Sequence, residues 1–169
     1  MNYTKIKMSD IANGPGVRSS IYVSGCTHNC PGCFNPETHD FNSGKPWTKD
    51  IEDKIIKHVN DDDLSGLNIL GGDPLQQIKD DDLINFMKRF KAETHKDIWL
   101  WTGYTFEDII NTESKACNIL KECDIVVDGE YVEALSDIRL RYMGSSNQRV
   151  IDVKKSLQQH KTVLWEGDQ

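Results

Sequence analysis

The chain has 169 residues, of which 37% are hydrophobic and 28% are charged. This length and composition predict a single globular domain with a full hydrophobic core, and no apolar run reaches the length of a membrane span. The formal net charge of −7, from 27 acidic and 20 basic residues, argues against a nucleic-acid-binding surface. Because the N-terminus lacks the apolar stretch of a signal peptide, we expect a cytoplasmic protein with reduced cysteines.

Segments with strand and helix patterns alternate along the chain. Short runs of β-branched and aromatic residues indicate strands, and apolar stripes with helical spacing indicate helices. Threonine or aspartate stands at the expected helix starts, which suits the N-terminal end of a helix. In chain order we expect an edge strand at 3–11, a strand at 18–24, a helix from 48 that ends at the acidic run 61–63, a strand at 67–70, a helix opened by 80–82, a strand at 98–101, helical pieces at 105–110 and up to 120, a strand at 125–127, and a terminal strand at 162–165.

This alternation predicts the fold class. Strands that are separated by helices pair in parallel through right-handed crossovers. A closed (β/α)8 barrel takes about 250 residues, which is more than this chain has. We therefore expect an α/β fold in the form of an open, partial (β/α) barrel, a single domain over residues 1–169 with helices on its outside. In such folds the chemistry lies at the C-terminal ends of the strands.

Three cysteines follow the strand at 18–24 directly. Cys26, Cys30 and Cys33 have the spacing C-x3-C-x2-C and come from one short loop. Thiolates hold the irons of iron–sulfur clusters, and three of them fit three corners of a [4Fe–4S] cube. If no fourth cysteine joins them, one iron keeps an open position for a small molecule. The spacing therefore predicts a cluster with a ligand-binding iron.

Other interpretations of the cysteines are less favoured. A disulfide framework is unlikely because the chain has five cysteines, an odd number. A zinc site that adds His28 to the three loop cysteines is chemically allowed, but zinc sites usually show two separated pairs of ligands. We expect His28 to be exposed to solvent, and we expect Cys117 and Cys123 to be small buried hydrophobic residues.

Glycine and polar residues follow each of the later strands. Gly71-Gly72-Asp73-Pro74 comes after the second buried strand, and glycines let the backbone approach a ligand closely. Thr102 and Asp128 follow the next two strands, where a polar ligand contact and an ordinary strand-end cap are both open. Trp99 and Trp101 are expected to pack, one on each side of their strand.

The residues around the cysteine loop carry a family resemblance. Asn13-Gly14-Pro15-Gly16 precedes the loop, Ser24-Gly25 leads into it, and Phe34-Asn35 leaves it. With the C-x3-C-x2-C spacing and the Gly-Gly-Asp-Pro motif, the chain resembles the radical S-adenosylmethionine (SAM) superfamily. Within that superfamily it resembles the activating proteins of anaerobic (class III) ribonucleoside-triphosphate reductases. The partial barrel would then be of the radical SAM type.

The resemblance implies two cofactors, a [4Fe–4S] cluster and SAM. Cys26, Cys30 and Cys33 would be the cluster ligands, and Gly71-Gly72-Asp73 would meet the amino group of SAM, in the place where the superfamily usually has Gly-Gly-Glu. The superfamily commonly has an aromatic residue before the third cysteine, and here that position is glycine. The remaining implied contacts are Gly32, Cys33 and Phe34 near the adenine (with a core position for Phe34 as the alternative), Thr102 at the carboxylate or ribose, Asp128 in the same pocket, and Gly144–Arg149 beside the pocket or the partner.

The function implied by this resemblance is activation of another enzyme. A 5′-deoxyadenosyl radical made from SAM would take a hydrogen from the Cα of a glycine in the large reductase subunit, which leaves a glycyl radical. The implied partners are that subunit and a low-potential electron donor such as flavodoxin, with no nucleic acid and no membrane. Two alternatives stay open: an activase of another glycyl radical enzyme such as pyruvate formate-lyase, and a non-catalytic iron–sulfur electron carrier or redox sensor.

Overall fold

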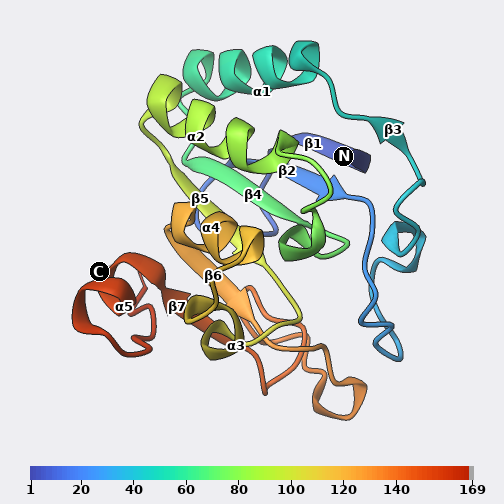
Figure 1. The fold of residues 1–169 in the computed structure, drawn as a ribbon, viewed down its shortest axis with the longest axis vertical. Coiled ribbons are helices and arrows are strands. Elements are labelled where there is room, and N and C mark those ends of the chain that lie inside the picture. The colour runs from blue at the N-terminus through green and yellow to red at the C-terminus, as the bar shows by residue number, and fades with distance from the viewer. Residues whose placement is uncertain (168–169) are drawn as a thin grey trace.

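A computed structural model describes residues 1–167 (Figure 1). The seven strands form one sheet in the order β3-β1-β2-β4-β5-β6-β7. The strands are β1 Asn2–Asp10, β2 Arg18–Val23, β3 Lys45–Pro46, β4 Gly66–Gly71, β5 Asp97–Trp101, β6 Ile125–Asp128 and β7 Arg149–Asp152, and the α-helices are α1 Lys49–Asp61, α2 Asp82–Thr94, α3 Phe106–Ile110, α4 Lys115–Glu122 and α5 Val153–Gln159.

The middle of the sheet is parallel, as the alternating pattern predicts. β2, β4, β5 and β6 pair in parallel in that order. β1 pairs antiparallel with β2, and β7 pairs antiparallel with β6. The structure is therefore a mixed α/β fold with an open sheet, and the expectation that the sheet does not close is confirmed.

Three local expectations need correction. β1 is not the edge strand, because the two-residue strand β3 pairs with its outer side. The stretch 162–165 makes only an isolated bridge between Ile151 and Leu164 and is not a strand. Helix α5 was not expected from the sequence, although Asp152 caps it by accepting a hydrogen bond from the backbone of Lys155 at 2.9 Å.

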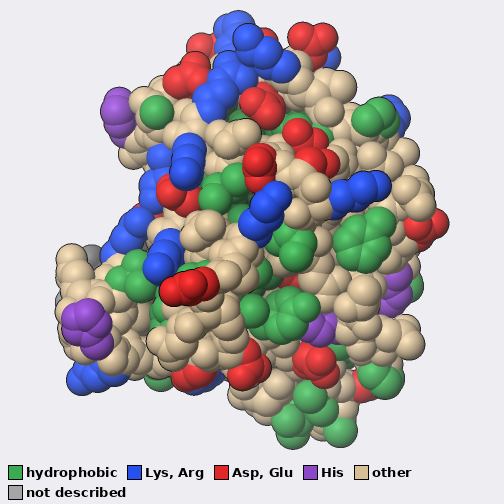
Figure 2. Space-filling view, in the orientation of Figure 1, with side chains coloured by type: hydrophobic (Ala, Val, Ile, Leu, Met, Phe, Trp, Pro, Cys, Tyr) green, Lys and Arg blue, Asp and Glu red, His purple; other side chains and the backbone are tan. Residues whose placement is uncertain are grey.

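The helices cover one face of the sheet with an apolar core. Ile21, Ile69, Leu100 and Val126 point to this face from successive strands and are fully buried. Acidic and basic side chains are interspersed over α1 and α2 on the face shown in Figure 2, where Arg89 pairs with carboxylates of both helices. No helix among residues 1–167 combines the length and the apolar character that a membrane crossing needs.

The opposite face of the sheet carries larger aromatic and polar residues. Trp99 and Trp101 both lie on this face, with ring centroids 5.9 Å apart. The expectation that they pack on opposite sides of the strand is wrong, because side chains alternate with a period of two and residues i and i+2 share a face. Tyr22 and Leu70 lie on the same face and begin the floor of a cavity.

Candidate functional site

A cavity opens at the C-terminal ends of the parallel strands. Its volume is about 420 Å³, within the range of small-molecule sites. Tyr22, Leu70 and Trp101 line it from the inner face of the sheet, and the cysteine loop lines one side. Parallel strands end at one edge of the sheet, so loops that are far apart in the sequence meet here. We call this space the strand-end cavity.

The three loop cysteines line the strand-end cavity together. Cys26, Cys30 and Cys33 are free thiols and are half-buried. Burial raises the pKa of Cys26 to about 11 and raises the pKa of Cys30 as well. Metal ligation needs the thiolate. Burial disfavours this charged form, and a bound metal cation would favour it. The backbone N–H of Asn35 donates to Cys33 Sγ at 3.4 Å, a contact of the kind that tunes cluster sulfurs.

The loop suits a cluster better than a single zinc ion. A structural zinc ion takes four protein ligands, and this loop supplies three thiolates, whereas a cube binds each of three thiolates to a different iron. Both ring nitrogens of His28 are also already engaged by carboxylates. The donor set therefore fits the [4Fe–4S] group.

The two remaining cysteines lie far from the loop, in the core on the helix side. Cys117 and Cys123 are 2% and 0% exposed, and burial holds the pKa of Cys123 far above its ordinary value. Their thiols contact the backbone oxygens of Ile110 and Ile119. Their expected role as small buried hydrophobic residues agrees with this position.

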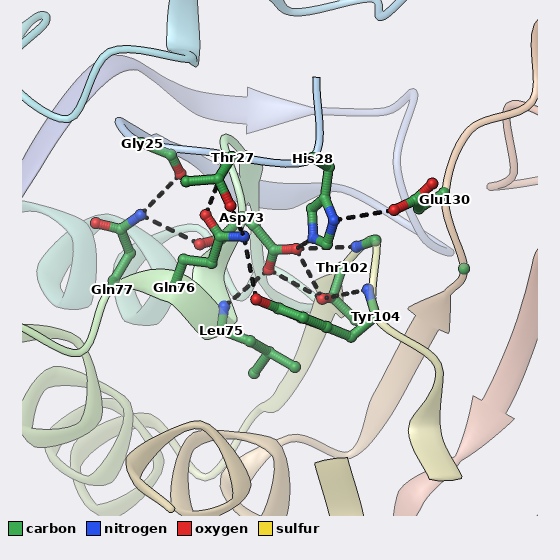
Figure 3. A network of polar contacts seen from close by, with 12 residues as sticks. Gly25, Thr27, His28, Asp73, Leu75, Gln76, Gln77, Thr102, Tyr104 and Glu130 are labelled. Carbon is green, nitrogen blue, oxygen red and sulfur yellow. Dashed lines mark hydrogen bonds and ion pairs between the residues drawn. The ribbon is translucent and has the colours of Figure 1, made fainter. Parts of the chain in front are cut away.

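Asp73 forms the centre of a polar network at the rim of the cavity (Figure 3). Its carboxylate is 1% exposed. Oδ1 accepts hydrogen bonds from the N–H of Leu75 and the hydroxyl of Thr102, both at 2.9 Å. Oδ2 lies 3.0 Å from the N–H of Gly103 and 2.6 Å from Nε2 of His28. The structure thus turns this carboxylate toward protein donors from three loops.

His28 is not exposed to solvent, which corrects the expectation from the sequence. Its side chain is 10% exposed, because it lies between Asp73 and Glu130, with Nδ1 at 3.2 Å from Glu130 Oε1. The ring also packs edge-on against Tyr104, with centroids 4.6 Å apart. The hydrogen bond to Asp73 raises the pKa of His28, Glu130 adds to the effect, and burial opposes it.

The two glycines of the Gly-Gly-Asp-Pro motif stand where backbones meet. Gly71 has φ +99°, and a Cβ on Gly72 would lie 2.5 Å from the carbonyl oxygen of Gly25. The N–H groups of Gly72 and Asp73 donate to the carbonyls of Val23 and Gly25 at 2.8 and 2.9 Å. The motif is thus fixed against the start of the cysteine loop, and the N–H groups of Gly72 and Asp73 have no hydrogen left to donate to a ligand.

Thr102 and Asp128 differ in their relation to the cavity. Thr102 lines it, but its hydroxyl donates to Asp73. Asp128 does not line it: its carboxylate accepts from the N–H of Phe106 at the start of α3 and pairs with Arg149 at 2.6 Å. The strand-end cap, one of the two readings open from the sequence, describes Asp128. Arg149 also pairs with Glu107 and holds the pKa of that carboxyl down at about 2.

Gly32 and Phe34 flank the third cysteine but face different surroundings. Phe34 lines the cavity, is 65% exposed and packs against Tyr131 with centroids 4.8 Å apart. A core position for Phe34 is therefore excluded. Gly32 lies outside the lining residues, and a Cβ there would meet the carboxylate of Glu133.

Residues 129–148, which we call the covering segment, supply a wall that the sequence did not fully reveal. Tyr131, Tyr142 and Met143 line the cavity from it. Gln148 anchors it by accepting from the N–H of Gly144 and donating to the carbonyl of Gly129, so the expectation that 144–149 lies beside the pocket agrees with the structure. The segment lacks strand or helix periodicity, and only its aromatic residues signalled an inner surface.

Comparison with known proteins places this geometry in a family. A family described as a 4Fe-4S single cluster domain matches residues 12–151. The anaerobic ribonucleoside-triphosphate reductase-activating protein of Escherichia coli (strain K12) is 42% identical over 153 residues, which cover 89% of this chain and 97% of that protein. Proteins of the same name from Vibrio cholerae serotype O1 and Enterobacteria phage T4 are 38% and 39% identical over 151 residues, covering 88% and 89% of this chain and 96% and 93% of theirs.

The matched region runs from the residues before the cysteine loop to β7, so it includes every wall of the strand-end cavity. The class of protein is that of the single-cluster 4Fe-4S domains. Within it, the chain belongs to the family of anaerobic ribonucleoside-triphosphate reductase-activating proteins. The family resemblance drawn from the cysteine spacing and its flanks is confirmed.

Proposed function

We propose that this chain is a radical SAM enzyme that activates an anaerobic ribonucleotide reductase. Cys26, Cys30 and Cys33 hold a [4Fe–4S] cluster, and SAM occupies the strand-end cavity beside it. Once bound and reduced by a low-potential donor such as flavodoxin, the cluster would supply the electron for reductive cleavage of SAM to methionine and a 5′-deoxyadenosyl radical, and that radical would take hydrogen from a glycine Cα of the large reductase subunit. The residues of the chain bind and orient these cofactors and exclude water from them.

The single observation that carries this proposal is that the cysteine loop and the Gly-Gly-Asp-Pro motif line one cavity. The amino group of SAM is a hydrogen-bond donor and needs acceptors. At Gly72 and Asp73 the N–H groups already donate to other backbone carbonyls, and the carbonyl of Asp73 already accepts from the N–H of Gln76 and from Nε2 of Gln77. Of these two positions, the carbonyl oxygen of Gly72 is left to receive the amino group. An electron carrier needs a cluster but no such cavity, so this geometry favours the enzyme.

The aromatic surfaces of the cavity suit the nucleoside part of SAM. Phe34 is largely exposed at the cavity beside Cys33, and adenine has a π-face that stacks on such a ring. Trp101 and Tyr142 add apolar surface from the sheet and the covering segment. We assign the adenine to the Phe34 side, with the backbone at Gly32 and Cys33 close by, and Thr102 to the polar end.

A protein substrate needs an open site, and the sheet is open. We interpret residues 1–169 as one domain with a partial barrel of the radical SAM type, whose incomplete wall admits a glycine-bearing segment of the reductase. The names of the curated relatives favour the reductase over pyruvate formate-lyase as the partner. Insertion of that segment combines its local unfolding with binding, which lowers net affinity.

The test is SAM cleavage by anaerobically reconstituted, reduced protein, measured as 5′-deoxyadenosine. We expect cleavage to rise when the large reductase subunit is added, and we expect deuterium placed on the Cα of the target glycine to appear in 5′-deoxyadenosine. A cluster that forms without any SAM cleavage would leave the electron carrier as the better function. A glycyl radical that forms without deuterium transfer would exclude direct abstraction.

A further inference from the structure

The carboxylate of Asp73 has no capacity left for a ligand. A carboxylate offers about four lone-pair sites. Those of Asp73 meet the N–H of Leu75, the hydroxyl of Thr102, the N–H of Gly103 and the ring of His28. At 1% exposure the group is also closed to solvent. Its role at this site must therefore be exerted through the protein groups that it binds.

Those groups come from different strand ends, which Figure 3 shows meeting at one point. Leu75 belongs to the turn after β4, and Thr102 and Gly103 follow β5. His28 belongs to the cysteine loop and lies two residues after Cys26 and two before Cys30. One buried carboxylate thus joins the turn that carries the glycine motif, the end of β5 and the middle of the cysteine loop.

His28 extends the connection to a fourth segment. Its Nδ1 lies 3.2 Å from Oε1 of Glu130, the second residue after the end of β6. Each ring nitrogen of His28 therefore lies within hydrogen-bond distance of a carboxylate oxygen, on Asp73 at one side and on Glu130 at the other. A Cβ on Gly103 would lie 2.7 Å from Cδ2 of His28, so a glycine at this position is what lets the ring approach. The ring is therefore held on each side, and the cysteine loop with it.

We propose that Asp73 and His28 are positioning residues that hold the cysteine loop at a fixed place over the strand ends. Both side chains line the strand-end cavity, but their polar atoms bind protein groups, so they act on cluster and SAM through the position of the loop. What the loop holds rests on the proposed function. The contacts from Asp73 through His28 to Glu130, which we call the tie, are a property of the chain itself. The proposal differs from the role that the family resemblance implies for Asp73, which is a place in the SAM-binding motif.

A double-mutant cycle tests the tie without any cofactor. We compare the urea midpoints of the apo protein for Asp73→Asn, His28→Gln and the double variant. A tie predicts that the double variant loses clearly less than the sum of the single losses, since contacting residues are not additive. The matched control is Asp10→Asn, which alters another buried carboxylate that binds Ser20, Asn13 and Ala12. Asp10→Asn and His28→Gln should add. Additive losses for Asp73 and His28 would overturn the proposal.

The same variants are then reconstituted, and SAM affinity and the EPR spectrum of the reduced cluster with SAM are measured. We expect about a tenfold loss of affinity in each single variant, because a displaced cysteine loop weakens contacts with SAM, with little further loss in the double variant. The SAM-induced change in the EPR spectrum should alter in parallel. A loss in Asp73→Asn but none in His28→Gln would show direct contact between Asp73 and SAM, and unchanged affinity and spectrum in both would show a purely structural pair. Either result overturns the proposal.

Glu130→Gln guards against variants that do not fold, because the side chain of Glu130 is 58% exposed. It should weaken SAM binding by a smaller factor than His28→Gln. Unchanged SAM binding would show that the contact between His28 and Glu130 does not help to position the loop. Failure of the wild-type protein to bind or cleave SAM would remove the proposed function and leave the apo cycle intact. An additive apo cycle in a fully active protein would remove the positioning role alone.

Discussion

The two faces of the sheet use alternate residues of the same strands for different purposes. On the helix side, Ile21 and Ile69 pack into a continuous apolar core. On the cavity side, the neighbouring positions hold Ser20 and Asn68, which bind each other at 3.0 Å, and Arg18, which is fully buried and donates to Asn68 at 2.7 Å. Apolar burial stabilises the first face, whereas the second combines a smaller apolar cluster of Trp99, Ile125 and Val127 with polar groups that must all be paired.

This difference separates stability from function within one sheet. A residue on the helix side contributes by filling volume, so its loss leaves a cavity. A residue that lines the strand-end cavity contributes to the space for a ligand. Substitutions of helix-side core residues and of cavity-lining residues should therefore differ in kind: the first should change the free energy of unfolding, and the second should change what the protein binds.

The largest contrast is expected among the cysteines. Cys30→Ala removes a thiolate that we propose as a cluster ligand and should abolish cluster assembly and SAM cleavage, and Cys26→Ala and Cys33→Ala should do the same. The Cys117→Ala variant, altered in the helix-side core, should keep the iron content of the wild-type protein and lose only stability. Iron and sulfide per chain, with the absorbance of the cluster, measure both. Loss of the cluster in Cys117→Ala would contradict the claim that helix-side residues affect stability alone.

The next effect concerns the helix side. Phe86 is 0% exposed and packs between Trp47 and Phe90. Phe86→Ala should lower the free energy of unfolding by about 3–5 kcal/mol, measured by urea denaturation. Because the residue lies far from the strand-end cavity, the protein that remains folded should bind SAM with wild-type affinity. A changed affinity in that folded fraction would show that the core and the cavity are coupled.

A smaller effect is expected at the junction between the turn and the cysteine loop. Gly72→Ala places a methyl group 2.5 Å from the carbonyl oxygen of Gly25, so the entry to the loop must move. Such overpacking costs about 1–3 kcal/mol, and we expect less iron per chain as well as weaker SAM binding. Normal iron content with weak SAM binding would instead indicate that this glycine faces the ligand alone.

The smallest effect is expected at the pair of Glu107, in α3, and Arg149, at the start of β7. The pKa of Glu107 is lowered to about 2, so the pair stabilises the folded state above the ordinary glutamate pKa and is lost as the pH falls from about 5 toward 2. Because the Glu107 side chain is 50% exposed, its share is at most about 1 kcal/mol. Unfolding measured from pH 6 to pH 3 should show a shallower loss in Glu107→Gln. An identical slope would mean that the pair contributes nothing.

Local sequence patterns were enough to find the elements that build the sheet. The four parallel strands and the helices α1 and α2 follow from runs and stripes whose signal lies within a few residues, and Thr48 caps α1 by accepting from the N–H of Ile51. Asp152 gave the same kind of signal for α5, but the helix is too short for a clear stripe. The cysteine loop was found because the spacing of its three cysteines is itself local.

The tertiary structure decided everything that depends on segments meeting. Burial of His28 requires Asp73 and Glu130, which lie 45 and 102 residues away in the chain. Asp128 likewise binds Arg149 and does not face the cavity. The path of the covering segment is fixed by hydrogen bonds such as that from Nε1 of Trp101 to the carbonyl of Tyr142. Residue type and spacing specify which chemistry a loop offers, but the partner of a polar group depends on which strand ends lie side by side, and that is set by the pairing of the whole sheet.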